Sequence, residues 1–487
     1  MRLDAVQSSL VLIGAATFAL IVTLFLALLG LKYALILAPG LCAMAVLARA
    51  PFLPFLLLIL SIPLDAVANL LFVGLPIEAT QALVAATLGA VLLNAAAEPR
   101  SARLGPNELS LRLAILFAIA SLTSFLVGEH SYLAIRFILR LLGMYLIVYL
   151  AIRVISRIVQ IEVVLMSLVA ATLFSGLTLI AESYLGIRLF SSAAAAVTAQ
   201  FGDIARSSGA SDYNPTTAAA MTLTGMLIAL VLFVEHPKWR WLTGPTVVVG
   251  AVAVVLSFAR SSALCLGLLA PMLAWRYRKR EWFALGVVLV LLSMVCAIPF
   301  VPDAYWERLQ SLISWPPVDR TLWRRLGYNL IGLQVLLDNP ILGVGPANFP
   351  LHYVDTDFRF YPGRTLLPRH LHNMYLGVAA EFGLIGLALF LGLVGYLLSE
   401  LRKAMRRATD AATRCLAAAL LFGFISWLIT SVFLPNQFNK FTWALIGISA
   451  AFVRVARLEA NAQASTAGSP TAGSTALENR AMGDNGG

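Results

Sequence analysis

A histidine and an asparagine stand together at the start of a long apolar run late in the chain. They are His372 and Asn373, and the run continues to a Gly-x-x-Gly step at Gly383 and Gly386. A histidine has a pKa near neutrality, so it can take a proton from an attacking hydroxyl group. Lipid offers polar side chains no hydrogen-bond partners, so a polar pair at this point has little structural purpose. His372 is therefore the candidate general base.

Arginines in three other segments have the chemistry to bind phosphate. The planar guanidinium group forms paired, charge-assisted bonds to phosphate oxygens and keeps its charge. Two arginines from different segments can hold a pyrophosphate and stabilise the charge that builds up as a sugar leaves it. The candidates are Arg206 in an Arg-Ser-Ser-Gly string, Arg260 in the turn 257–262, and Arg320 with Arg324 one turn apart on a predicted helix.

Each of these candidates also has a structural explanation. A histidine at a helix start can be only a cap or an interfacial residue, and Arg260 can extend its charge to lipid headgroups. Glu381, in the first turns of the apolar run, can orient His372 or the acceptor, or serve equally as a buried pairing residue. Gly383 and Gly386 are better explained as a close helix-packing face than as a phosphate cradle. Asn373 is a possible supporting residue beside the histidine.

The composition indicates that lipid surrounds most of the chain. Of 487 residues, 60% are apolar and 12% are charged, whereas a soluble domain carries roughly 25% charged residues. The net charge of +11 is explained by basic residues in short cytoplasmic loops. The sequence has no basic stripe with interleaved aromatic residues, so nucleic-acid binding is not predicted. The four cysteines lie inside apolar runs without CxxC spacing, so neither a disulfide framework nor a metal site is predicted.

The apolar runs predict one all-α membrane domain over residues 1–458, with about 12–14 transmembrane helices. A spanning helix needs about 20 mostly apolar residues. The 14 candidate runs are 10–31, 34–49, 52–72, 77–97, 110–128, 133–152, 160–182, 216–235, 243–258, 261–275, 282–300, 373–399, 415–434 and 438–456. Three of them are short, which leaves 12 or 13 spans possible (34–49, 243–258 and 261–275).

The distribution of lysine and arginine predicts that both termini are cytoplasmic. The densest basic clusters lie at 276–280, 402–407 and 454–457. Residues 183–215, the turn 257–262 and one large loop at about 301–371 are then periplasmic. The chain from residue 459 to 487 is rich in Ala, Ser, Thr and Gly and has no apolar period. A disordered cytoplasmic tail is predicted there.

The large loop is predicted to contain an amphipathic helix. Asp319 can cap it, its leucines recur every three to four residues, and Asp338-Asn339-Pro340 ends it. Such a helix can lie along the membrane surface with its leucines facing lipid. Arg320 and Arg324 would then project from one face, one turn apart.

Two strings in this chain resemble the O-antigen ligase and polymerase superfamily, membrane glycosyltransferases that use polyprenyl-pyrophosphate carriers. One is the spacing His-Asn-x9-Gly-x-x-Gly from His372, and the other is Asn-Pro-Ile-Leu-Gly-Val-Gly-Pro-Ala-Asn-Phe from Asn339 to Phe349. The resemblance covers roughly residues 200–450. It implies a membrane fold classed with the C-type glycosyltransferases and an inverting mechanism without a metal or other cofactor.

The resemblance also implies roles for individual residues. By position, Arg260 and Arg320 bind the carrier pyrophosphate and His372 activates the acceptor. The family's loop arginine usually precedes an aromatic residue by four positions, whereas Trp323 follows Arg320 by three. Arg324 therefore stays an alternative to Arg320.

The activity that the resemblance implies is transfer of an oligo- or polysaccharide to an acceptor hydroxyl at the periplasmic face of a bacterial inner membrane. The donor would be a polyprenyl-pyrophosphate-linked glycan, and the acceptor lipid A core for a ligase or another glycan for a polymerase. A protein acceptor is less favoured, because that branch often has a large periplasmic C-terminal domain. The alternative function is a polytopic transporter or a flippase of lipid-linked sugars. Transporters place charges near the bilayer midplane, often within repeats, and this chain shows neither pattern.

Overall fold

The computed structural model describes most of the chain between residues 50 and 467. The described residues are 50–70, 72, 78–97, 108–128, 132–190, 200–201, 204–211, 214–281, 283–288, 292, 303, 306, 310, 320–365 and 367–467. The predicted spans 10–31 and 34–49, most of the predicted span 282–300 and most of the loop before Arg320 lie outside them.

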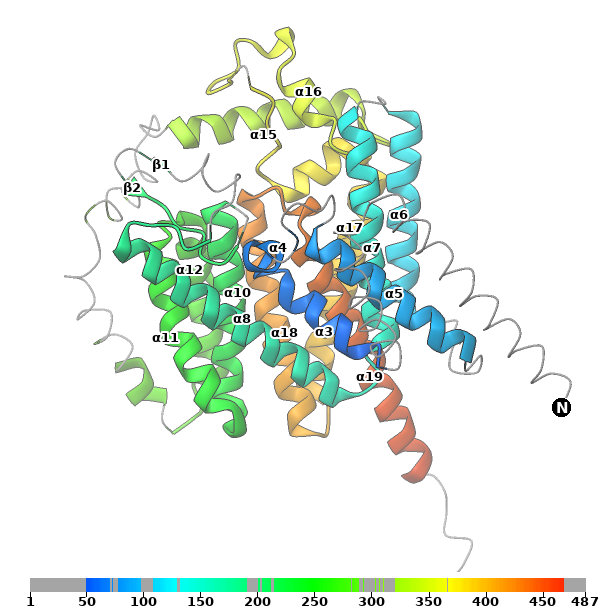
Figure 1. Cartoon of the computed structure of the whole chain (residues 1–487), viewed down its shortest axis with the longest axis vertical. Coiled ribbons are helices and arrows are strands. Elements are labelled where there is room, and N and C mark those ends of the chain that lie inside the picture. The colour runs from blue at the N-terminus through cyan, green and yellow to red at the C-terminus, as the bar shows by residue number, and fades with distance from the viewer. Residues whose placement is uncertain are drawn as a thin grey trace, which may run out of the picture.

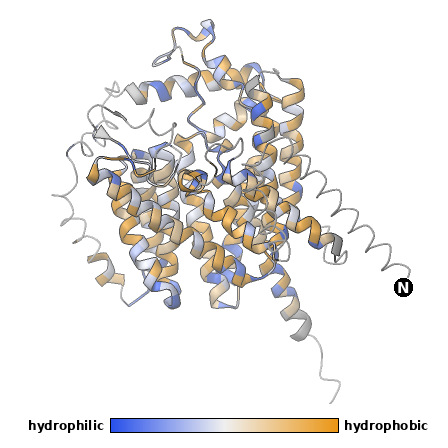
Figure 2. Cartoon of the chain, viewed as in Figure 1, coloured by the Kyte–Doolittle hydropathy of each residue, from blue (hydrophilic) through white to orange (hydrophobic). Residues whose placement is uncertain are grey.

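Long apolar helices packed side by side form the body of the molecule (Figure 1). Within the described residues, eight are long and apolar enough to cross a membrane. They are α6 (Leu109–Val127), α7 (Tyr132–Val154), α8 (Ile158–Leu185), α10 (Pro215–Glu235), α11 (Arg240–Leu256), α17 (Met374–Arg407), α18 (Ala411–Thr430) and α19 (Lys440–Ala467). Figure 2 shows apolar residues throughout this bundle and hydrophilic residues gathered at helix ends and in the segment that crosses one end of it. The prediction of an all-α integral membrane protein is confirmed.

Further elements pack around these spans. They are α3 (Phe52–Ser61), α4 (Asp65–Leu70), α5 (Ala79–Ala97), α12 (Arg260–Tyr277), the 3-10 helices η1 (Pro237–Trp239), η4 (Ser431–Phe433) and η5 (Asn436–Phe438), and an antiparallel pair, β1 (Gln200–Phe201) with β2 (Ile204–Ala205). The predicted span 52–72 is wrong as one helix, because the chain turns between α3 and α4. The helix ends at Ser61, two residues before Pro63, which has no backbone N–H to continue the hydrogen-bond pattern.

Small and hydroxyl-bearing residues allow the central helices to approach closely. α10 is the most enclosed of the eight spans and packs against α8, α11 and α18. A Cβ added at Gly225 of α10 would lie 1.8 Å from the Thr172 hydroxyl oxygen of α8. Thr224, on the same helix, lies with its hydroxyl 3.1 Å from the Ser426 hydroxyl of α18. Close backbone approach of this kind is the usual way in which helices associate in lipid.

One end of the bundle carries the basic clusters. Arg276 at the end of α12 pairs with Glu235 at the end of α10, with 2.7 Å between Nη2 and Oε1. Arg457 of α19 pairs at 2.6 Å with Glu400, near the end of α17. Helices that end here begin at the other end of the bundle, which we call the loop end because the large loop crosses it.

The loop end is covered by α15 (Arg320–Asp338), which runs across the spans rather than along them (Figure 1). The helix ends at Asp338, as the Asp-Asn-Pro string predicts. Its inner face is buried (Tyr328, Ile331 and Val335). Its outer face exposes leucines (Leu330, Leu333 and Leu337). Two short elements follow it, α16 (Phe349–Tyr353) and η3 (Thr356–Phe358).

The final helix extends into the segment that was predicted to be a disordered tail. α19 continues through Ala467, so residues 459–467 are helical rather than disordered. This stretch contains Ala, Glu and Gln, which favour helix and can extend a span beyond its apolar part. The rest of the predicted tail lies outside the described residues.

Helix α17 is broken at Gly383. This residue has φ 67° and ψ −173°, which no α-helix contains, and the segment that follows α15 passes alongside the break. Val344 donates its N–H to the Ala380 carbonyl at 3.0 Å, and Gly345 donates to the Glu381 carbonyl at 3.0 Å. The carbonyls that the break would leave without partners are therefore satisfied, as a membrane interior requires.

The other half of the broken helix is satisfied by the same segment. Leu384 donates its N–H to the Pro340 carbonyl at 2.8 Å. A Cβ added at Gly383 would lie 2.1 Å from the Ile341 carbonyl oxygen. The predicted role of Gly383 as a face for close helix packing is corrected, because it packs against a crossing segment and supplies a left-handed backbone conformation.

We expect Gly383→Ala to destabilise the protein strongly. The backbone conformation of Gly383 is essentially restricted to glycine and costs a residue with a Cβ on the order of 1–3 kcal/mol, and the clash with Ile341 adds to this. Gly392→Ala is the matched control, since it lies on the same helix and a Cβ there meets nothing within 4 Å. Thermal unfolding of both variants in detergent measures the effect. Equal midpoints would contradict the role assigned to Gly383.

Candidate active site

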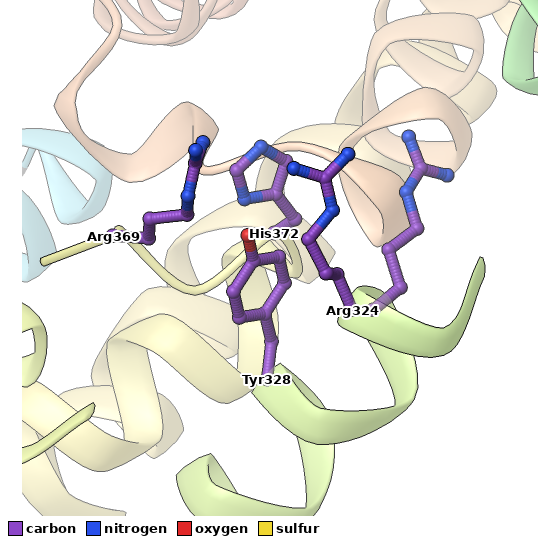
Figure 3. A pocket seen from close by; sticks show the side chains of 5 residues that line it. Arg324, Tyr328, Arg369 and His372 are labelled. Carbon is purple, nitrogen blue, oxygen red and sulfur yellow. The ribbon is translucent and has the colours of Figure 1, made fainter. Parts of the chain in front are cut away.

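A small cavity opens at the loop end, between α15 and the start of α17. It has a volume of about 90 Å³ and is lined by Arg324, Arg325, Tyr328, Arg369 and His372. Figure 3 shows the imidazole between Arg369 on one side and the arginines of α15 on the other, with the Tyr328 ring beneath. A water molecule occupies about 30 Å³ in the liquid, so the cavity accepts a small group and not a sugar chain.

Two contacts fix the orientation of the His372 ring. It stacks on the Tyr328 ring, with centroids 5.0 Å apart and planes inclined by 16°. Its Nδ1 lies 2.9 Å from the His370 carbonyl oxygen. A carbonyl only accepts hydrogen bonds, so this contact requires a proton on Nδ1. In the neutral ring Nε2 then carries the free lone pair, which is the atom that can take a proton.

The surroundings of His372 favour its neutral form. Burial lowers the pKa of His372 to about 4, and the positive charges of Arg325 and Arg369 act in the same direction. The hydrogen bond to His370 opposes this effect. The imidazole is therefore unprotonated at neutral pH. An anion bound between the arginines would raise its pKa again, because a nearby negative charge stabilises the imidazolium.

Asn373 forms the N-terminal cap of α17. Its side-chain oxygen accepts hydrogen bonds from the N–H groups of Tyr375 and Leu376, at 3.1 and 3.2 Å. These N–H groups would otherwise have no partner inside the helix. The His-Asn pair therefore combines a ring at the cavity with a cap that begins the helix behind it.

The arginines of the cavity form a concentrated positive site. Within the described residues, neither Arg324 nor Arg369 forms an ion pair with a carboxylate. The Arg325 guanidinium lies 5.8 Å from the centre of the Phe433 ring. Arg324 and Arg369, which have no carboxylate partner among the described residues, are suited to bind an anion, and above all a phosphate.

Sequence reasoning found only part of this group. Arg324 was a candidate and lies in the cavity, whereas Arg320 begins α15 with a side chain outside the described part of the structure. Arg325, Tyr328 and Arg369 were missed. A helix places residues i and i+4 on one face, so the spacing from Arg324 to Tyr328 was the signal that could have found the tyrosine.

Arg260 lies in a strained turn at the same end of the bundle. It is the first residue of α12 and only 7% exposed. Phe258, two residues earlier, has φ 53°, a left-handed conformation that is rare for bulky residues and tends to occur at functional sites. Arg206 supports the turn, because its Nε donates to the Ser257 carbonyl at 2.9 Å and its Nη2 to the Thr216 hydroxyl at 3.2 Å.

The Arg260 turn and the His372 cavity lie beside the same end of α18. Cys265, in the second turn of α12, lies with its sulfur 3.5 Å from the Ser426 carbonyl oxygen. Tyr375, in the first turn of α17, donates its hydroxyl to the Leu428 carbonyl at 2.8 Å. The structure thus brings His372 and Arg324 into one cavity. It places Arg260 and Arg206 at the same end of the bundle but outside the lining of that cavity.

Glu381 also lies outside the lining of the cavity. It is buried in α17 next to the break, and its carboxyl group faces the backbone N–H groups of Ala347 and Phe349 and the side chain of Gln437. The Glu381 carboxyl group is therefore not placed to contact an acceptor in the cavity.

A comparison with known families matches the region that holds these groups. Residues 245–391 match a family model described as O-antigen ligase. This stretch includes the Arg260 turn, α15, the segment at the helix break and the His372-Asn373 pair. No curated protein matches the chain. The resemblance found in the sequence is thereby confirmed over residues 245–391, which are similar to the O-antigen ligase family.

Proposed function

We propose that this protein transfers an oligo- or polysaccharide from a polyprenyl-pyrophosphate carrier to an acceptor hydroxyl group. The observation that carries the proposal is the cavity in which a neutral imidazole lies beside Arg324 and Arg369, which form no ion pair with a carboxylate among the described residues. The two halves of the reaction need these two components, a base for the hydroxyl and positive charge for the leaving pyrophosphate.

The proposed reaction is a single displacement. Nε2 of His372 takes the proton of the acceptor hydroxyl while the hydroxyl oxygen attacks the anomeric carbon of the donor. The bond from that carbon to the pyrophosphate oxygen breaks, and its electron pair leaves with the pyrophosphate. One displacement inverts the anomeric configuration. Arginines supply the positive charge for the leaving group, so the proposal requires no metal ion.

The proposal divides the pyrophosphate between two groups of arginines. Arg324 and Arg369 would bind the phosphate next to the reacting carbon, because they line the cavity that contains His372. Arg260 would bind the second phosphate, with Arg206 holding its turn. Arg320 stays an alternative to Arg324, one turn earlier on the same helix.

The proposed setting is the bacterial inner membrane, with the loop end in the periplasm and both termini in the cytoplasm. This orientation follows the positive-inside rule, since the basic clusters lie at the opposite end of the bundle. The acceptor would be either lipid A core or another glycan, as in the ligase and polymerase branches of the superfamily. A transporter is less well supported, because the charged cavity lies at the loop end rather than at mid-membrane depth.

We expect Arg324→Lys and Arg260→Lys to lose most of the transfer activity, by about tenfold or more. Lysine keeps the charge but has no planar fork for paired phosphate bonds, and each such charge-assisted bond contributes about 1.5–3 kcal/mol. Arg457→Lys, at the opposite end of the bundle, is the matched control. Transfer is measured with purified protein, a polyprenyl-pyrophosphate glycan and mass spectrometry of the product. Native rates in both site variants would show that the paired geometry is not used.

His372→Ala is expected to lower transfer by roughly 10²–10⁴-fold, the usual contribution of a general base. Donor binding in the same membranes should persist, since arginines hold the pyrophosphate. His236→Ala, at the opposite end of the bundle, serves as the control for loss of a histidine. Transfer at a near-native rate would remove His372 from the mechanism, and loss of donor binding would assign it to the pyrophosphate site instead.

The pH dependence should reveal the lowered pKa of His372. A base acts only when unprotonated, so kcat/KM should stay level as the pH falls through 6.5 and decline only near a pH of about 4. The decline in kcat should occur at a higher pH, because bound pyrophosphate raises the pKa of the imidazole. An acid limb of kcat/KM at the ordinary histidine pKa would contradict the buried, arginine-flanked arrangement.

A further inference from the structure

Glu381 is a buried acid whose carboxyl group the proposed reaction does not use. The residue is 1% exposed, and its Oε2 has no hydrogen-bond partner among the described residues. Within the same residues, no lysine or arginine forms an ion pair with it. A buried polar group with an unsatisfied atom requires an explanation, because it has lost its hydrogen bonds to water without replacing them.

The carboxyl group of Glu381 lies at the start of α16. It faces the N–H groups of Ala347 and Phe349, and Phe349 is the first residue of that helix. Ala347 has φ 59°, a left-handed conformation that is strained for a residue with a Cβ. The Glu381 carboxyl group on the neighbouring helix supplies an acceptor to this strained turn. Asn348 supports the same turn by donating its side-chain N–H to the Val344 carbonyl at 2.8 Å.

Helix α16 in turn lies behind the aromatic stack of the cavity. Tyr353, its last residue, is fully buried, and its ring centroid lies 5.2 Å from that of Tyr328. Tyr328 stacks directly on His372. The Tyr353 hydroxyl also accepts a hydrogen bond from the Thr365 N–H at 2.9 Å. Contacts thus run from Glu381 through α16 and Tyr328 to the imidazole.

The backbone closes the break in α17 without the help of the Glu381 side chain. Val344 and Gly345 donate to carbonyls of α17, and Ser124 donates its hydroxyl to the Glu381 backbone carbonyl at 2.7 Å. Removal of the carboxyl group leaves all three bonds in place. The role of this side chain can therefore be separated from the integrity of the helix break.

We propose that Glu381, together with Gln437, is a positioning residue that fixes the turn 347–349 and, through α16 and Tyr328, the orientation of the His372 ring. The proposal rests on the proposed role of His372 as the base. A misplacement of about 1 Å far from the chemistry can cost roughly 10²-fold in rate. Glu381 therefore influences the rate although it does not line the cavity.

Three substitutions test this role. Glu381→Ala removes the acceptor, Glu381→Asp withdraws it from the turn, and Glu381→Gln keeps an oxygen within reach of the same N–H groups. Glu400→Ala is the matched control, because it lies on the same helix at the opposite end and only pairs with Lys403 and Arg457. The purified full-length variants are assayed for kcat, for the donor KM and for the pH dependence of kcat/KM.

We expect Glu381→Ala and Glu381→Asp to lower kcat by about tenfold or more while the donor KM changes by less than about threefold. The acid limb of kcat/KM should move upward from a pH of about 4, because a loosened Tyr328 stack exposes His372 to water. Arg324, Arg325, Arg369 and His370 still face the ring and limit the shift. Glu381→Gln and Glu400→Ala should keep native kcat and the native acid limb.

Other outcomes overturn the proposal. If Glu381→Ala and Glu381→Asp only reduce the amount of folded protein and leave kcat and the acid limb unchanged, the side chain is merely structural. If Glu381→Gln is as slow as Glu381→Ala, the negative charge matters and hydrogen-bond acceptance does not. His372→Ala separates this failure from that of the proposed function. An inactive His372→Ala beside a fully active Glu381→Ala contradicts only the positioning role, whereas an active His372→Ala contradicts the base itself.

Discussion

The rest of the structure depends on the way in which a broken transmembrane helix keeps its backbone hydrogen-bonded. Lipid cannot satisfy a free N–H or C=O group, so a helix can be interrupted inside a membrane protein only where another segment replaces its bonds. Here the segment after α15 donates to the carbonyls before Gly383 and accepts from the N–H groups after it. That exchange ties the large loop to the bundle. Since α15 and α16 flank this segment, its hydrogen bonds at the helix break also determine where the cavity lies.

The charges around His372 are a second constraint on the site. Arginines surround an imidazole whose burial, reinforced by their positive charge, lowers its pKa and keeps it neutral. In the proposed reaction the pyrophosphate of the donor supplies the negative charge that pairs with these arginines. The same charge raises the proton affinity of the base as the donor binds, so the imidazole becomes a better base when there is a substrate to use it. A site built in this way gains its full reactivity only after the donor has arrived.

Local signals in the sequence were reliable where the structure depends on neighbours in the chain. The Asp338-Asn339-Pro340 string ends α15 as predicted, and the His372-Asn373 pair begins α17 with a side-chain cap. Features made by distant segments were not visible. Gly383 looks like a packing residue in the sequence, because nothing near it reveals that residues 340–345 pass alongside. Arg369 follows no helical period, so only the fold shows that it faces Arg324 across the imidazole.

The size of the cavity has a consequence for the products that such a protein can make. In the proposed reaction a cavity of about 90 Å³ holds the reacting centre and leaves most of a glycan outside it. Selectivity would then lie in the first sugar and its phosphate, and chains of one repeat or of many would react alike. Control over length would then come from the supply of donor or from other proteins. One catalyst could thus finish surface polymers of widely different lengths.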